Sequence, residues 1–138
     1  MTETSTSKCV LVADDDPRSR RLVSETLRNA GYLVVEAVDG GHALRELRLP
    51  VAQFDLAVLD IQMPGIDGCM VAREVRHSER WRTLPLLALT ALTSPDDVTR
   101  ILEAGCDAYL SKPVLLVDLR ATAAQLIADS NGAHGAVR

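Results

Sequence analysis

The chain has 138 residues and a net charge of -4, with 47% hydrophobic and 25% charged residues, which is typical of one globular domain. This balance gives no general reason to expect binding to nucleic acid or a membrane surface. The polar start lacks the apolar core of a signal peptide, and no apolar run approaches the ~20 residues that span a bilayer. We expect a domain over residues 8–128, a flexible arm over 1–7 and a flexible tail over 129–138.

The cysteines give little sign of a disulfide framework or a zinc site. They are three in number, without a C-x-x-C pair: Cys9, Cys69 and Cys106. Small buried hydrophobic side chains in a reducing compartment are the better interpretation. We therefore expect the protein to be cytoplasmic.

Strands and helices alternate five times along the chain. Short apolar runs bounded by turn residues predict strands over residues 9–13, 32–37, 55–60, 84–90 and 108–111. Segments with the apolar spacing of amphipathic helices follow them and begin near residues 17, 40, 68, 95 and 115. Right-handed crossovers between such units predict a doubly wound α/β fold, with a parallel sheet and helices on both faces.

Three arginines crowd the start of the first predicted helix, where the helix dipole disfavours cations: Arg18, Arg20 and Arg21. A charge run of this kind usually marks a solvated face, and we expect one here. The neighbouring acidic residues 14–16 offer a local electrostatic reason for the arginines.

The most informative segment surrounds Asp60. Residues 57–59 show no polar alternation, which is typical of a central strand covered on both faces. Asp60 follows at the carboxyl end of this strand, where open α/β sheets bind their ligands. Pro64 and Gly65 supply a turn into the next helix.

Other polar residues also follow predicted strands: Asp14 and Asp15, Thr90, and Lys112. Because the carboxyl ends of parallel strands share one edge, we expect these residues to meet Asp60 there. Two carboxylates ~4 Å apart repel by about 4 kcal/mol at an effective dielectric near 20, so the site needs protons or a cation. Oxygen ligands suit Mg²⁺ or Mn²⁺ better than zinc, and the backbone carbonyl of Gln62 is a reasonable further ligand.

This set of groups favours phosphoryl transfer. A phosphoryl group in transfer carries its charge on peripheral oxygens, so its stabilisation is mainly electrostatic. A divalent cation, the Lys112 ammonium, and either the Thr90 hydroxyl or the Ala91 amide would each hold one oxygen. Asp60 would attack in line and become an acyl phosphate, and an ionised carboxylate needs no general base.

Four segments resemble the receiver domains of bacterial two-component response regulators. They are Asp14–Pro17, Asp60–Gly68, Ala88–Ala91 and Gly105–Pro113. The resemblance covers residues 8–128 and implies a flavodoxin-like (βα)5 fold with strand order 2-1-3-4-5. It also implies a signalling phosphoprotein of a phosphorelay, similar to single-domain chemotaxis regulators, that catalyses only its own phosphorylation and dephosphorylation.

The resemblance implies a role for each site residue. Asp60 would be the phosphoacceptor, assisted by Lys112, which would precede a cis peptide bond. Asp14, Asp15, Asp60 and the Gln62 carbonyl would hold Mg²⁺ or Mn²⁺, with Asp15 the more direct ligand than Asp14.

The resemblance further implies a switch and partners. Thr90 would move to the phosphoryl group, and Tyr109 would then turn inward on the face formed by the fourth helix, fifth strand and fifth helix. That face would bind an unknown downstream protein or form a weak dimer. The donor would be a histidine kinase or histidine phosphotransfer protein that docks near Arg18, Leu22 and Pro113. Neither nucleic acid nor membrane would be a direct partner.

Three alternatives stay open. The chain could be a receiver segment of a larger regulator or hybrid kinase. A Mg²⁺-dependent aspartyl phosphatase of the haloacid-dehalogenase type would need a second acid where Gln62 stands, and a flavodoxin would need a hydroxyl-rich loop where residues 14–16 are aspartates. The lifetime of the phosphorylated form is also open, since Leu92 should hinder an attacking water whereas Gln62 could orient one.

Overall fold

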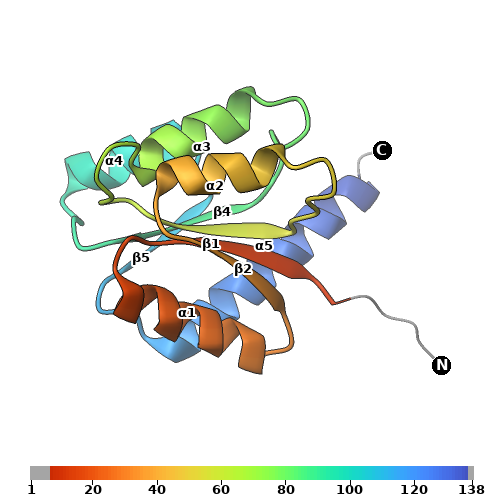
Figure 1. Ribbon diagram of the computed structural model, residues 1–138, viewed down its shortest axis with the longest axis horizontal. Helices are drawn as coiled ribbons and strands as arrows, with labels where there is room; N and C mark the ends of the chain where they lie inside the picture. The colour runs from red at the N-terminus through yellow and green to blue at the C-terminus, as the bar shows by residue number, and fades with distance from the viewer. Residues whose placement is uncertain (1–6, 137–138) are drawn as a thin grey trace.

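The chain forms one parallel sheet of five strands in the order β2-β1-β3-β4-β5, as predicted (Figure 1). This computed structural model describes residues 7–136, with side chains to residue 130, so nearly all of the expected arm lies outside it. The strands are β1 (Cys9–Ala13), β2 (Leu33–Ala37), β3 (Leu56–Asp60), β4 (Leu86–Thr90) and β5 (Ala108–Ser111). The helices are α1 (Pro17–Asn29), α2 (Gly40–Arg48), α3 (Gly68–His77), α4 (Pro95–Ala104) and α5 (Leu116–Ala136).

Helices cover both faces of the sheet. Figure 1 shows α2, α3 and α4 on one face and α1 and α5 on the other. Successive side chains of a strand point to opposite faces, so Leu11 packs in the core under α2 to α4 whereas Val10 packs in the core under α1 and α5. All five residues of β3 are buried, as expected for the central strand.

Helix caps keep the polar residues that follow the strands outside the helices. The Asp16 carboxylate accepts a hydrogen bond from the Arg18 N–H at 3.1 Å, and Pro17 occupies the first helical position. Ser94 caps α4 in the same way by accepting from the Asp97 N–H. Because α1 begins only at Pro17, the two acidic residues before Asp16 stay in the turn at the sheet edge.

Helix α5 continues past residue 128, where the sequence predicts that the domain ends and a flexible tail begins, and the backbone is helical up to Ala136; residues 137–138 lie outside the described part of the chain. Gln125 Nε2 donates to Asp129 Oδ1 at 2.7 Å, and such a pair four residues apart supports the helix across the expected boundary. The Asn and Gly residues that suggested a tail express only weak local preferences. Within residues 7–136, none of the helices combines the length and hydropathy needed for a bilayer crossing.

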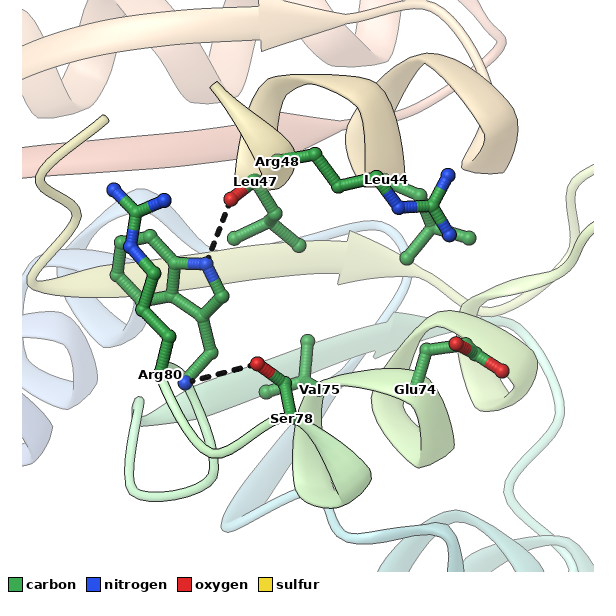
Figure 2. Close-up of a pocket in the computed structure, with 8 residues that line it drawn as sticks. Leu44, Leu47, Arg48, Glu74, Val75, Ser78 and Arg80 are labelled. Carbon is green, nitrogen blue, oxygen red and sulfur yellow. Dashed lines mark hydrogen bonds between the residues drawn. The ribbon is translucent and has the colours of Figure 1, made fainter. Parts of the chain in front are cut away.

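Trp81 lines a pocket of about 220 Å³, together with residues of α2 and α3; Figure 2 shows Leu44 and Leu47 of α2 opposite Val75 of α3 in this pocket. Its indole Nε1 donates to the Leu47 carbonyl at 2.8 Å, and its ring centroid lies 5.8 Å from that of Phe54. The Arg80 guanidinium lies 4.6 Å from the indole centroid and donates to the Leu49 carbonyl at 2.9 Å. Trp81 therefore fastens the end of α2 to the α3–β4 loop.

We expect Trp81→Ala to lower the free energy of unfolding by about 2–4 kcal/mol, since it removes a large ring that is mostly surrounded by protein. Urea denaturation followed by circular dichroism measures the change. Arg82→Ala, at an exposed position in the same loop, serves as the control and should cost less than about 0.5 kcal/mol, because the Arg82 side chain is exposed. Equal losses in the two variants would contradict the role of the indole.

Candidate functional site

Polar side chains from four strand ends lie at the carboxyl edge of the sheet. Asp14 follows β1, and Asp60 and Thr90 are the last residues of β3 and β4. Lys112 follows β5, and its N–H donates to the Thr90 carbonyl at 2.8 Å. Since β1, β3, β4 and β5 are consecutive neighbours in the sheet, residues up to 98 positions apart in the sequence share one site.

Three carboxylates meet at this edge. Asp14, Asp15 and Asp60 each place one oxygen within 4.8 Å of the others. Asp14 and Asp60 are only 1% and 3% exposed, whereas Asp15 is exposed. Backbone N–H groups orient the buried pair, because Asp16 donates to Asp14 Oδ1 at 3.0 Å and Gln62 donates to Asp60 Oδ1 at 3.1 Å.

Lys112 lies between the two buried carboxylates. Its Nζ is 3.3 Å from Asp14 Oδ2 and 3.3 Å from Asp60 Oδ2, and its side chain is 23% exposed. The Lys112–Pro113 peptide bond is cis, as expected. One ammonium thus counters two carboxylates, which leaves the cluster short of positive charge.

The pKa values of Asp14 and Asp60 shift in opposite directions in this environment. Burial, followed by the hydrogen bond and charge of Asp14, raises the pKa of Asp60 to about 6. Burial acts in the same sense on Asp14, but its hydrogen bonds with Ser19, the Asp16 N–H and Asp60, together with the Lys112 charge, lower the pKa of Asp14. A cluster of oxygen donors that are costly to ionise together suits a hard divalent cation.

The Thr90 hydroxyl lies outside this carboxylate cluster. It is fully buried, donates to the Leu92 carbonyl at 3.1 Å and accepts from the Leu92 N–H at 2.9 Å. Tyr109 is 38% exposed and pairs in register with Ala88, two residues before Thr90 on the neighbouring strand. The structure therefore brings Asp14, Asp15, Asp60 and Lys112 together, with the Gln62 backbone against Asp60. Thr90 and Tyr109 lie beside the site.

Two residues contact the site in ways that the sequence did not predict. A Cβ atom on Gly68 would collide with the Asp60 carbonyl oxygen, so glycine lets α3 begin directly against the end of β3. Arg20, which we expected on a solvated face, is only 16% exposed and donates to the Asp14 carbonyl at 2.9 Å. The only sequence signal for Arg20 is its closeness to the acidic residues, and the sequence marks Gly68 only as the start of the next predicted helix.

Comparisons with known proteins agree with this geometry. The family model of the response regulator receiver domain matches residues 10–124. Over 106 residues the chain is 42% identical to the DNA-binding dual master transcriptional regulator RpaA of Synechocystis, a match that covers 75% of this chain and 42% of RpaA. The chemotaxis protein CheY4 of Vibrio cholerae is 33% identical with a TM-score of 0.82, over 88% of this chain and 99% of that one.

A second solved structure is the receiver domain of a sensor histidine kinase from Pseudomonas aeruginosa, with a magnesium ion coordinated in its active-site cleft. It has a TM-score of 0.80 and 31% identity, over 89% of this chain and 99% of that one. The chain spans about half or less of the length of the curated relatives it matches.

The family match includes every strand tip that forms the acidic site, from the end of β1 to the residue after β5. The strand order is the one that the sequence resemblance implied. Fold, site and family match thus lead to one conclusion: the chain belongs to the response regulator receiver domains, the phosphoacceptor signalling domains of two-component systems.

Proposed function

We propose that Asp60 accepts a phosphoryl group from a phosphohistidine donor in a Mg²⁺-dependent reaction. The observation that carries the proposal is the placement of the Asp60 carboxylate, which lies between two other carboxylates and the Lys112 ammonium at the carboxyl edge of the sheet. The donor would be a histidine kinase or a histidine phosphotransfer protein, since receiver domains occur in regulators and sensor kinases among the relatives.

Asp14, Asp15 and Asp60 would hold the cation, together with the backbone carbonyl of Gln62. Their donor atoms are oxygens, which suit Mg²⁺ or Mn²⁺, and the magnesium ion in the Pseudomonas aeruginosa receiver supports this assignment. When bound, the cation would neutralise charge on the phosphoryl oxygens and reduce repulsion among the carboxylates.

The chain's own residues would carry out the rest of the reaction. A carboxylate oxygen of Asp60 attacks the phosphorus in line and forms the new P–O bond, while the P–N bond of the donor breaks and its electron pair stays on the imidazole. Lys112, already 3.3 Å from Asp60, binds a peripheral phosphoryl oxygen and stabilises the charge that builds there. The product is an acyl phosphate on Asp60.

Thr90 and Tyr109 would transmit the change. To reach the phosphoryl group, the Thr90 hydroxyl must leave its two hydrogen bonds with Leu92. The space vacated beside β4 would then accept the half-exposed Tyr109 ring from β5. The surface of α4, β5 and α5 would change for a downstream protein partner or a second receiver.

The direct test is intact-mass analysis after incubation with Mg²⁺ and phosphoramidate or acetyl phosphate. We expect the wild-type chain to gain one phosphoryl group, which hydroxylamine removes because it cleaves acyl phosphates. Chelation of the divalent cation should prevent labelling, and Asp60→Asn should abolish it.

Asp55→Asn is the matched control, because Asp55 precedes the same strand at its opposite end. This variant should be labelled like the wild type. Labelling of Asp60→Asn at the wild-type level, or a phosphoryl group that resists hydroxylamine, would overturn the proposal.

A further inference from the structure

We infer that Arg20 is a positioning residue of the acidic site: through the Asp14 carbonyl it fixes the peptide from which Asp15 projects, and so raises the affinity of the site for a divalent cation. The inference rests on the proposed function, because the cation is the one required there. Arg20 itself does not contact the reacting atoms.

The Arg20 side chain connects three parts of the fold. Its Nη1 donates to the Asp14 carbonyl at 2.9 Å, and its Nε donates to Glu36 Oε1 at 3.1 Å. Arg20 belongs to α1, Asp14 to the turn after β1, and Glu36 to the edge strand β2. A side chain that is 16% exposed and bonded in two directions is held in place, which a solvated arginine is not.

Glu36 is anchored in turn from further along α1. Its Oε2 accepts from Arg28 Nη2 at 3.2 Å, so Arg20 and Arg28, eight residues apart on α1, both donate to the Glu36 carboxylate. β2 also holds the other end of Asp14, since the Asp14 N–H donates to the Ala37 carbonyl at 3.1 Å. Both polar groups of the Asp14 backbone are therefore fixed with reference to β2, one directly and one through Arg20.

The bond from Arg20 to the Asp14 carbonyl affects the orientation of the Asp15 carboxylate more than that of the Asp14 carboxylate. The Asp14 carboxylate has its own donors in the Asp16 N–H and Lys112. Asp15 is exposed, and the orientation of the preceding peptide sets the direction of its carboxylate toward Asp60. If that peptide could rotate, cation binding would have to order it, and the ordering would cost affinity.

Only arginine fits these contacts. Its planar fork presents one N–H to the Glu36 carboxylate and another to the Asp14 carbonyl at the same time. The single ammonium of a lysine lacks that fixed pair of directions. Arg20→Lys should therefore keep the charge and recover only part of the positioning.

Calorimetric titration of Mg²⁺ into the unphosphorylated chain tests the inference. We expect Arg20→Met to weaken Mg²⁺ binding about tenfold, Arg20→Lys to weaken it less, and the phosphorylation rate of Arg20→Met to recover at saturating Mg²⁺. Arg28→Met is the matched control, because it removes the second arginine from Glu36 and leaves the Arg20 bond to the Asp14 carbonyl. It should bind Mg²⁺ like the wild type.

Equal Mg²⁺ affinity in Arg20→Met and the wild type would overturn the inference, as would equal losses in Arg20→Met and Arg28→Met, which would indicate a merely structural role. A stability loss shared by both variants with an affinity loss in Arg20→Met alone would support it. The proposed function fails separately, by the absence of labelling at Asp60, because the titration needs no phosphodonor. A wild-type chain that binds no Mg²⁺ would overturn both.

Discussion

Lys112→Met should slow the phosphorylation of Asp60 by about 10²–10³-fold, the range seen when one charge-stabilising donor is removed from a transition state. Among the described residues, Lys112 is the one positively charged side chain that forms an ion pair with Asp60, with its Nζ 3.3 Å from Asp60 Oδ2. Methionine keeps much of the length of the side chain and removes the charge. The loss should therefore fall on the rate rather than on the fold of the site.

The rate is measured by intact mass over time with phosphoramidate at saturating Mg²⁺. Mg²⁺ affinity should stay equal or increase in Lys112→Met, since a neighbouring positive charge repels the cation. A lower phosphorylation rate with unchanged Mg²⁺ affinity would indicate a loss of charge stabilisation. A collapse of the acidic site would instead lower both the rate and the affinity.

The chain offers a natural control because it has just one other lysine, Lys8. Lys8 lies at the opposite edge of the sheet, where its Nζ is 4.0 Å from Asp55 Oδ1. Lys8→Met should be phosphorylated like the wild type. A Lys112→Met rate within about twofold of the wild-type rate, which is under 0.5 kcal/mol of barrier, would contradict the assigned role.

Asp60→Asn should stabilise the metal-free protein at pH 7.5, even though we expect it to abolish phosphorylation. Ionised Asp60 is buried beside Asp14 with one shared ammonium, and its pKa of about 6 lies well above the ordinary aspartate value of 3.8. At about 1.4 kcal/mol per pKa unit, the penalty is about 1–3 kcal/mol. The amide of an asparagine at position 60 is neutral at every pH, so the variant does not carry this ionisation penalty.

The pH dependence follows from the sign of that difference. Between pH 3.8 and about 6 the folded wild-type protein binds more protons than the unfolded chain, so its stability falls as the pH rises through this window. The advantage of Asp60→Asn should therefore be largest above pH 6 and fade toward pH 4.

Urea denaturation with EDTA at several pH values measures this effect, and Asp55→Asn serves as the control without the advantage. Added Mg²⁺ should reduce the difference in free energy of unfolding between Asp60→Asn and the wild type at pH 7.5, because it supplies the missing positive charge to the wild-type site. An Asp60→Asn protein that is less stable than the wild type at pH 7.5 would show that the Asp60 carboxylate is not under electrostatic strain.

The placement of Asp60 could be predicted because it depends on local pattern. An apolar run without alternation, followed by an acid and a Pro/Gly turn, gives a central strand with a carboxylate at its end, and β3 ends at Asp60. Proline and glycine also marked the limits of helices, since Pro17 begins α1 and Gly105 takes the left-handed conformation after α4 at φ +117°.

Local pattern did not predict two features of the structure. The Gly and Asn residues after Asp129 suggested a flexible tail, yet the backbone stays helical to Ala136. The three arginines at the start of α1 looked equivalent in the sequence, but only Arg20 among them donates to the Asp14 carbonyl and to Glu36. Nothing in the spacing of the residues distinguishes it.

The sequence by itself thus determined the alternation of strands and helices, the strand ends that carry acids, and the family. The tertiary structure alone decided that the Lys112 ammonium bridges Asp14 and Asp60, and that Arg20 bonds to Glu36 on the edge strand while it donates to the Asp14 carbonyl. The physical reason is the range of the interactions. Periodicity, caps and turns act over a few neighbouring residues, whereas these contacts depend on how the twisted sheet and its helices place side chains far apart in the chain.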